Sequence, residues 1–127
     1  MERKEMAVIG PLGLKYSFGI VADVRRLAFI SGQVALDESG AVLAPDNMEQ
    51  QSKLVFQSMA TLLAEAGASL GHVAKITTFV TDMSQYAAFT RVRNDVFEAP
   101  YPASTVVEVT ALAKPGLVVE VEALAVL

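Results

Sequence analysis

The fold class is decided by residues 45–81, PDNMEQQSKLVFQSMATLLAEAGASLGHVAKITTFVT. Within this stretch the pattern of apolar residues changes once, from helical spacing to a β-branched run typical of a strand. Asp46 or Asn47 is a candidate N-cap after the proline, and apolar residues then recur at helical spacing until Gly67, a typical left-handed residue after a helix end. The residues expected on the buried helix face are Met48, Leu54, Val55, Ser58, Met59, Leu62, Leu63 and Ala66. Residues 73–81 are rich in β-branched side chains and predict a buried strand.

The segments before this stretch predict strands. Residues 16–22 and 27–33 are apolar, β-prone runs on either side of a polar turn at 23–26, so a hairpin is expected. Residues 36–44 predict a short strand or turn. Residues 1–15, which include Gly10, Pro11 and Gly13, predict an irregular lead-in.

The segments after it predict a second helix and two more strands. Asp82 or Ser84 is the expected cap of a helix that continues to about Phe97. Its inward residues are expected to be Tyr86, Phe89, Val92, Val96 and Phe97. Strands are expected at 103–110 and 117–126, joined as a hairpin by a turn at 114–116. The pattern predicts a single α+β domain over residues 1–127, with two helices on one face of a mixed β-sheet.

The composition restricts the possible functions. Hydrophobic residues make up 53% of the 127 residues and charged residues only 19%, so we expect some apolar surface to be buried against another subunit. The formal net charge is −4, and Arg25-Arg26 is the one adjacent basic pair after the start. Nucleic-acid binding is therefore disfavoured, because a binder of phosphate backbones needs a basic face.

Several kinds of site and location are not expected. The sequence has no cysteine and a single histidine, His72, which is expected at the surface. A Ser-His-Asp triad and a metal site are therefore disfavoured, and no cofactor is expected. No apolar run is long enough to span a bilayer, and no signal peptide is visible, so a cytoplasmic protein is expected.

Three short segments are candidates for chemistry. Glu120 and Glu122 share one face of the last strand, either as an acidic solvent-facing surface or with one carboxylate in a cleft, where it handles a proton or a water. Ser31-Gly32 either ends a strand or lets a ligand approach the backbone closely. Ser104 either begins a strand or lies beside ligand-binding backbone groups.

In this order, these segments resemble the Rid superfamily, also called YjgF-type or L-PSP proteins. The resemblance covers about residues 10–126 and includes Tyr16-Ser17, residues 29–33, residues 73–82, Pro102-Ala103 and residues 119–123. It implies a chorismate-mutase-like fold and a homotrimer with small-molecule clefts between subunits. It also implies that Glu120 helps water attack an imine and that Tyr16 and Ser31 line the cleft. Gly32, Ala103 and Ser104 are expected to bind the substrate as well.

The sequence departs from the family at one informative position. Deaminating members read Pro-Ala-Arg, where the arginine pairs with the substrate carboxylate, but this chain reads Pro102-Ala103-Ser104. Arg91 or Arg93 is a possible substitute on the second helix. Two hypotheses follow, a hydrolase or deaminase of altered specificity and a non-catalytic binder of a small metabolite. The endoribonuclease activity sometimes attached to the family is a third, which the acidic composition disfavours.

Overall fold

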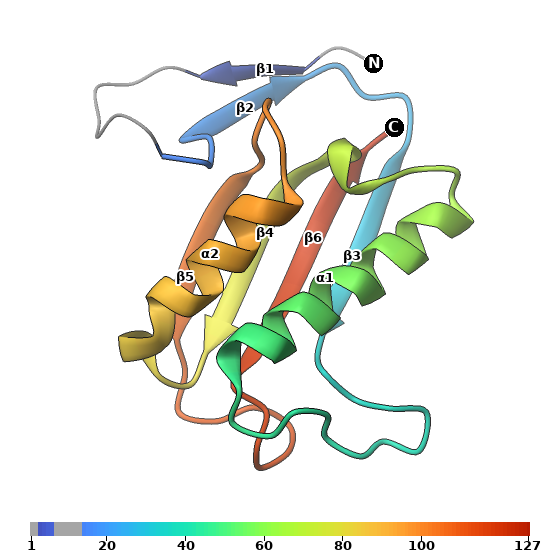
Figure 1. Cartoon of the computed structure of the whole chain (residues 1–127). Coiled ribbons are helices and arrows are strands. Elements are labelled where there is room, and N and C mark those ends of the chain that lie inside the picture. Colours follow the sequence, from blue (N-terminus) through green and yellow to red (C-terminus); the bar gives the residue numbers. More distant parts are fainter. Residues whose placement is uncertain (1–2, 7–13) are drawn as a thin grey trace.

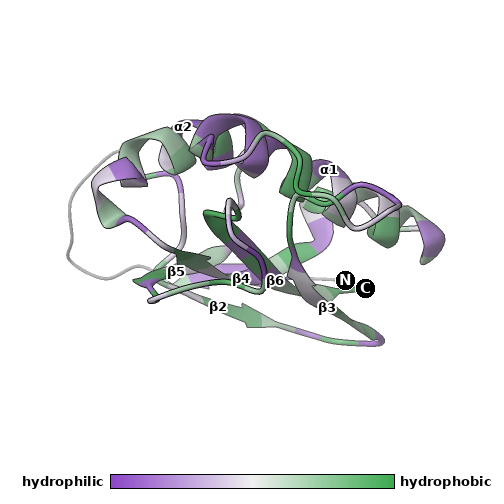
Figure 2. Ribbon diagram, turned by 90° about the horizontal axis from the view of Figure 1, so that it is seen from below, coloured by the Kyte–Doolittle hydropathy of each residue, from purple (hydrophilic) through white to green (hydrophobic). Residues whose placement is uncertain are grey.

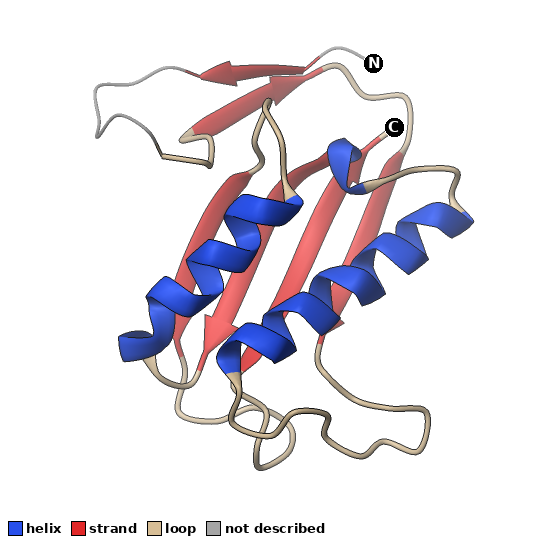
Figure 3. Ribbon diagram, in the orientation of Figure 1, coloured by secondary structure: helices blue, strands red, loops and turns tan. Residues whose placement is uncertain are grey.

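The computed structural model describes residues 3–6 and 14–127 of the chain (Figure 1). The helices are α1 (Met48–Glu65) and α2 (Tyr86–Val96), with two short 3-10 helices, η1 (Leu70–His72) and η2 (Met83–Gln85). The strands are β1 (Arg3–Met6), β2 (Gly19–Ala22), β3 (Leu27–Gln33), β4 (Val73–Val80), β5 (Ala103–Glu108) and β6 (Val119–Val126) (Figure 3). These elements confirm the α+β class.

The main sheet has four strands in the order β3-β6-β4-β5. Strand β6 runs antiparallel to both β3 and β4, whereas β4 and β5 are parallel and α2 forms the crossover between them. Both helices cover one face of this sheet, and no helix of the described chain covers the other (Figure 2). The sheet is therefore mixed and open on one side, as the sequence predicted.

Three sequence-based expectations about the strands are wrong. β2 does not pair with β3 but with β1, in a separate two-stranded sheet, so part of the expected irregular lead-in is a strand. β5 and β6 do not form a hairpin, because β6 inserts between β3 and β4. Such pairings are set by contacts between distant segments, which local turn signals do not report. Gly10, Pro11 and Gly13 lie outside the described residues.

Helix α1 begins and ends as its local signals predict. The Asn47 side chain accepts a hydrogen bond from the Gln50 amide at 3.0 Å, which makes Asn47 the N-cap. Gly67 follows the helix end with φ +70°. The buried face is rotated from the expected one, because Leu62 is exposed and Phe56 is buried. The Phe56 ring packs edge-on against Phe97, with ring centroids 5.4 Å apart.

Helix α2 is preceded by the capped turn η2. Asp82 accepts hydrogen bonds from both the amide and the hydroxyl of Ser84, and the hydroxyl contact holds the pKa of Asp82 below its ordinary value. Asp82 therefore caps η2 rather than α2 itself. Phe89 and Val92 face the core as expected, but Arg93 is also buried, which the sequence analysis did not anticipate.

The sheet face that carries no helix is unusual in composition. Strands alternate their side chains, so Val119, Val121 and Ala123 enter the core under the helices while Glu120 and Glu122 point to the open face. The open face also carries apolar side chains, with Leu27 and Phe29 45% and 76% exposed. An open face that mixes polar groups with large apolar groups is typical of an interaction surface.

Candidate functional site

Ser31 and Gly32 form a β-bulge in β3. The register with β6 shifts between Ile30, which pairs with Ala123, and Gln33, which pairs with Val121, so two residues of β3 lie opposite the single residue Glu122. A bulge of this kind interrupts the ladder and bends the strand locally. The sequence allowed Ser31-Gly32 either to end a strand or to let a ligand approach the backbone, and the structure places the pair within the strand, at this irregularity.

Gly32 lies directly beneath the Glu120 side chain. A Cβ atom built on Gly32 would lie 2.0 Å from Glu120 Oε2 and 2.6 Å from its carboxyl carbon. Any side chain at position 32 would therefore displace the carboxylate. The glycine is needed here for a close approach between strands, and it allows the half-buried Glu120 to lie over the bulge.

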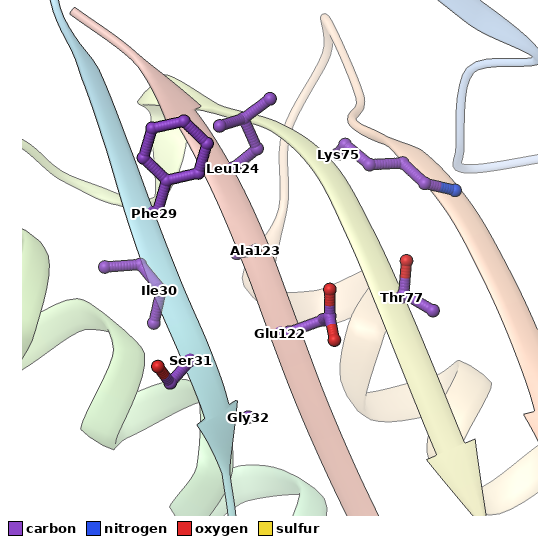
Figure 4. Close-up of a pocket in the computed structure, with 9 residues that line it drawn as sticks. All are labelled: Phe29, Ile30, Ser31, Gly32, Lys75, Thr77, Glu122, Ala123 and Leu124. Carbon is purple, nitrogen blue, oxygen red and sulfur yellow. The ribbon is translucent and has the colours of Figure 1, made fainter.

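A hollow of about 500 Å³ opens on the same face beside this bulge. Its lining residues come from β3, β4 and β6: Phe29, Ile30, Ser31, Gly32, Lys75, Thr77, Glu122, Ala123 and Leu124. Figure 4 shows the Glu122 carboxylate projecting from β6 toward Thr77 on β4, with Gly32 on the opposite side. Glu120 does not line the hollow but lies next to it, over Gly32, so the two carboxylates have different surroundings.

Lys75 is the one cationic residue among those that line this hollow. Its ammonium group donates a hydrogen bond of 2.7 Å to Thr105 Oγ1 on β5. Partial burial lowers the pKa of Lys75 below its ordinary value, because desolvation disfavours the charged form. Lys75 was not among the residues expected at the site. Side chains alternate between the two faces of a strand, so Lys75 faces away from the side of Ile76 and Val80. This alternation was the one sequence signal that Lys75 points away from the core.

The other candidate residues lie at the β5 edge of the sheet. The Ser17 amide donates a hydrogen bond of 3.0 Å to the Pro102 carbonyl, and Ser17 forms a parallel bridge with Ala103. These contacts hold Tyr16 beside the start of β5. Ser104 pairs with Ile76 and therefore points to the helix-covered side, whereas Ala103 points to the open side.

Arg93, but not Arg91, reaches Ser104. Arg91 is exposed on α2, whereas Arg93 is 3% exposed and its Nη1 lies 3.5 Å from Ser104 Oγ. The Arg93 guanidinium carbon also lies 5.1 Å from the centre of the Tyr16 ring, within cation–π range. Of the two arginines, Arg93 is therefore the one whose guanidinium lies beside position 104.

The structure thus divides the candidate residues into two groups. The bulge group is Ser31, Gly32 and Glu120, and the edge group is Tyr16, Ala103 and Ser104 with Arg93. Glu120 and Ser104 lie two strands apart and about three residues apart along the strands, a backbone separation of roughly 14 Å. Within a single chain the two groups are therefore separate, and Glu120 and Ser104 point to opposite sides of the sheet.

No cluster of potential metal ligands is found in residues 3–6 and 14–127. Within those ranges no three His, Asp or Glu side chains lie close enough together to hold a metal ion. In the same ranges no helix is long and apolar enough to cross a membrane. His72, expected at the surface, is partly exposed. Its Nδ1 accepts a hydrogen bond from the Ser69 amide at 3.1 Å, as part of the N-terminal capping box of η1.

The fold and this open-faced site define a small α+β domain with known relatives. The model of the family described as Endoribonuclease L-PSP matches residues 10–127. A mouse protein named 2-iminobutanoate/2-iminopropanoate deaminase is 33% identical over 123 residues, covering 97% of this chain and 86% of the mouse protein. The chain therefore belongs to the L-PSP family, the Rid superfamily that the sequence motifs resemble.

Solved structures support the same assignment. A Rid family protein of unknown function, YyfB from Yersinia pestis, superposes with a TM-score of 0.89 at 26% identity, over the full length of both chains. RidA from an Antarctic Psychrobacter superposes with a TM-score of 0.74 at 32% identity, over 98% of this chain and 94% of that one. The two-helix mixed sheet is therefore a Rid fold.

Proposed function

We propose that this protein binds a small metabolite in a cleft between two copies of the chain and hydrolyses its imine or enamine bond. Glu120 takes a proton from water, and the resulting hydroxide attacks the imine carbon. Protonated Glu120 returns this proton to the nitrogen, which gives a carbinolamine. The proton of the new hydroxyl group then passes to the same nitrogen, and the C–N bond breaks to release ammonia and leave a carbonyl compound. The observation that carries the proposal is the Glu120 carboxylate, which lies over Gly32 on the open sheet face.

The division of the candidate residues supports a cleft between copies. The bulge group lies on the open face and Ser104 lies on the other, roughly 14 Å away in the same chain. A second copy whose β5 edge packs against the open face would bring its own edge group to the first copy's bulge group. The exposed Leu27 and Phe29 and the low charge content both favour such packing. A homotrimer, as the resemblance implies, is the assembly that we propose.

A Glu120→Gln variant tests the chemistry. Glutamine preserves the size of the side chain but cannot take a proton, so imine hydrolysis should fall on the order of 100-fold, the usual contribution of a positioned base. The measurement is ammonia release from 2-iminobutanoate, generated in the assay by a separate amino-acid oxidase. Glu122→Gln is the matched control on the same strand face, and we expect it to retain most of the activity.

Two results would contradict the proposal. If Glu122→Gln abolishes ammonia release and Glu120→Gln does not, the carboxylate in the hollow is the base. If the wild-type protein releases no ammonia above the buffer rate from several imines, the protein is a non-catalytic binder. The serine at position 104, where the family resemblance implies an arginine in deaminating members, is the feature that favours this second function.

Phe29→Glu tests the assembly. Phe29 is 76% exposed on the open face, and a charge buried there between copies would lack a partner. We expect the variant to elute with the mass of one chain in size-exclusion chromatography with light scattering, and the wild type with the mass of three. Leu62→Glu is the control, because Leu62 is 37% exposed but lies on α1, away from the open face. Equal masses for wild type and Phe29→Glu would refute assembly through this face.

The family description also names an endoribonuclease. The formal net charge of −4 does not favour an RNA-binding surface. We therefore propose no RNA substrate. A salt-dependent affinity for single-stranded RNA, measured by fluorescence anisotropy, would revise that choice.

A further inference from the structure

Arg93 is the one charged side chain that is buried among the described residues. A guanidinium carries five N–H donors, and burial makes each unsatisfied donor unfavourable. In Arg93, Nη1 lies 3.5 Å from Ser104 Oγ, Nη2 lies 3.4 Å from Asn94 Oδ1, and Nε has no partner. Both contacts are longer than ordinary N–H···O hydrogen bonds, so the group is poorly satisfied.

No carboxylate of the described chain neutralises this charge. The one ion pair within residues 3–6 and 14–127 joins Lys53 to Glu49, on the exposed surface of α1. The rings of Tyr16 and Phe89 lie 5.1 and 6.0 Å from the guanidinium carbon, which offsets only part of the lost hydration. Among the described residues, Arg93 is therefore a buried cation with aromatic neighbours and no carboxylate counter-charge.

We propose that Arg93 binds an anionic group of the ligand, a carboxylate in the first place, and so determines the substrate class of the cleft. The inference rests on the proposed function, since it assigns Arg93 to the same cleft. Arginine's planar fork suits bidentate contact with a carboxylate, which the Ser104 hydroxyl cannot supply. The Arg93 side chain extends from α2 to Ser104 on the helix-covered side of β5. A cation therefore lies beside position 104, although the residue at that position is neutral.

Its position also explains why Ser104 is small and neutral. A second arginine at 104 would point at the Arg93 guanidinium from a contact distance of 3.5 Å and repel it. We therefore expect Ser104→Arg alone to impair anion binding. The double exchange Arg93→Ser with Ser104→Arg, in contrast, exchanges the two side chains between touching positions and keeps one cation in the cleft.

The test measures binding, not turnover. The probes are 2-oxobutanoate and its uncharged amide, 2-oxobutanamide, added to the assembled protein in isothermal titration calorimetry. We expect Arg93→Met to weaken 2-oxobutanoate binding on the order of 100-fold, the scale of hydrogen bonds to a charged group, and to leave amide binding nearly unchanged. Arg91→Met, on the exposed side of the same helix, should match the wild type, and the double exchange should recover at least 10-fold of the loss.

A second readout separates a ligand-binding role from a structural one. Methionine fills a similar volume without a charge, so removing an uncompensated buried cation should leave the melting temperature of the ligand-free protein unchanged or raise it. A lowered melting temperature, equal losses for acid and amide, or wild-type 2-oxobutanoate binding by Arg93→Met would each overturn the proposal. So would a wild-type protein that does not bind 2-oxobutanoate. Glu120→Gln should still bind 2-oxobutanoate, so a failure of the chemistry remains distinguishable.

Discussion

Imine hydrolysis should fall about 1,000-fold in a Gly32→Ala variant, within the range set by loss of a positioned base. The added methyl carbon would lie 2.0 Å from Glu120 Oε2 and 2.8 Å from its Cγ, so the whole side chain must turn away. The methyl group also occupies space beside the bulge. The expected loss therefore exceeds that of Glu120→Gln, which keeps the side chain in place.

The same variant should remain folded. Gly32 is not among the residues with positive φ, so alanine fits the backbone, and the half-buried Glu120 can rotate toward solvent. We expect the melting temperature to change by no more than about 3 °C. The control is Gly71→Ala, whose added carbon would meet only Ser69 Oγ, at 3.4 Å. Near-normal hydrolysis by Gly32→Ala would show that the position of Glu120 over the bulge is unimportant.

The largest loss of stability is expected from Gln51→Leu. Gln51 is fully buried in the first turn of α1, and its Nε2 donates to the carbonyls of Leu43, Ala44 and Gly116. Its Oε1 accepts from the Val118 amide at 2.9 Å. Leucine is similar in size but makes none of these bonds. Several buried backbone groups then lose their partners at once, and we expect about 4 kcal/mol of destabilisation.

Thermal denaturation measures this effect directly. For a chain of this length a loss of about 4 kcal/mol corresponds to a fall of roughly 15 °C in melting temperature. Gln50→Leu is the control, because Gln50 is the exposed neighbour of Gln51 on the same helix. A melting temperature within a few degrees of the wild type for Gln51→Leu would mean that water or a rearranged loop replaces the amide.

The sequence predicted those parts of the fold that local chemistry determines. The cap at Asn47 and the left-handed Gly67 are properties of a few neighbouring residues, and both were confirmed. The insertion of β6 between β3 and β4 was not predictable in this way, because it depends on which distant strands bury each other's faces. The burial of Gln51 was missed for the same reason, since its partners at Gly116 and Val118 are remote in sequence.

The candidate site shows the same division. Two-residue alternation correctly placed Glu120 and Glu122 on one face. The same rule, applied to Ala103 and Ser104, would have shown that adjacent residues of β5 face opposite sides of the sheet. What alternation does not report is the register shift at Ser31-Gly32 or the reach of Arg93 from α2, because both arise from the packing of one element on another.

The contact between Arg93 and Ser104 has a consequence for how members of a family are sorted. The two residues are 11 positions apart in the chain, but Arg93 Nη1 lies 3.5 Å from Ser104 Oγ. A residue of α2 can therefore place a positive charge beside position 104, although that position itself carries none. A comparison made position by position along the sequence records only a neutral serine at 104. A comparison of the charge in the volume around position 104 records the Arg93 guanidinium as well.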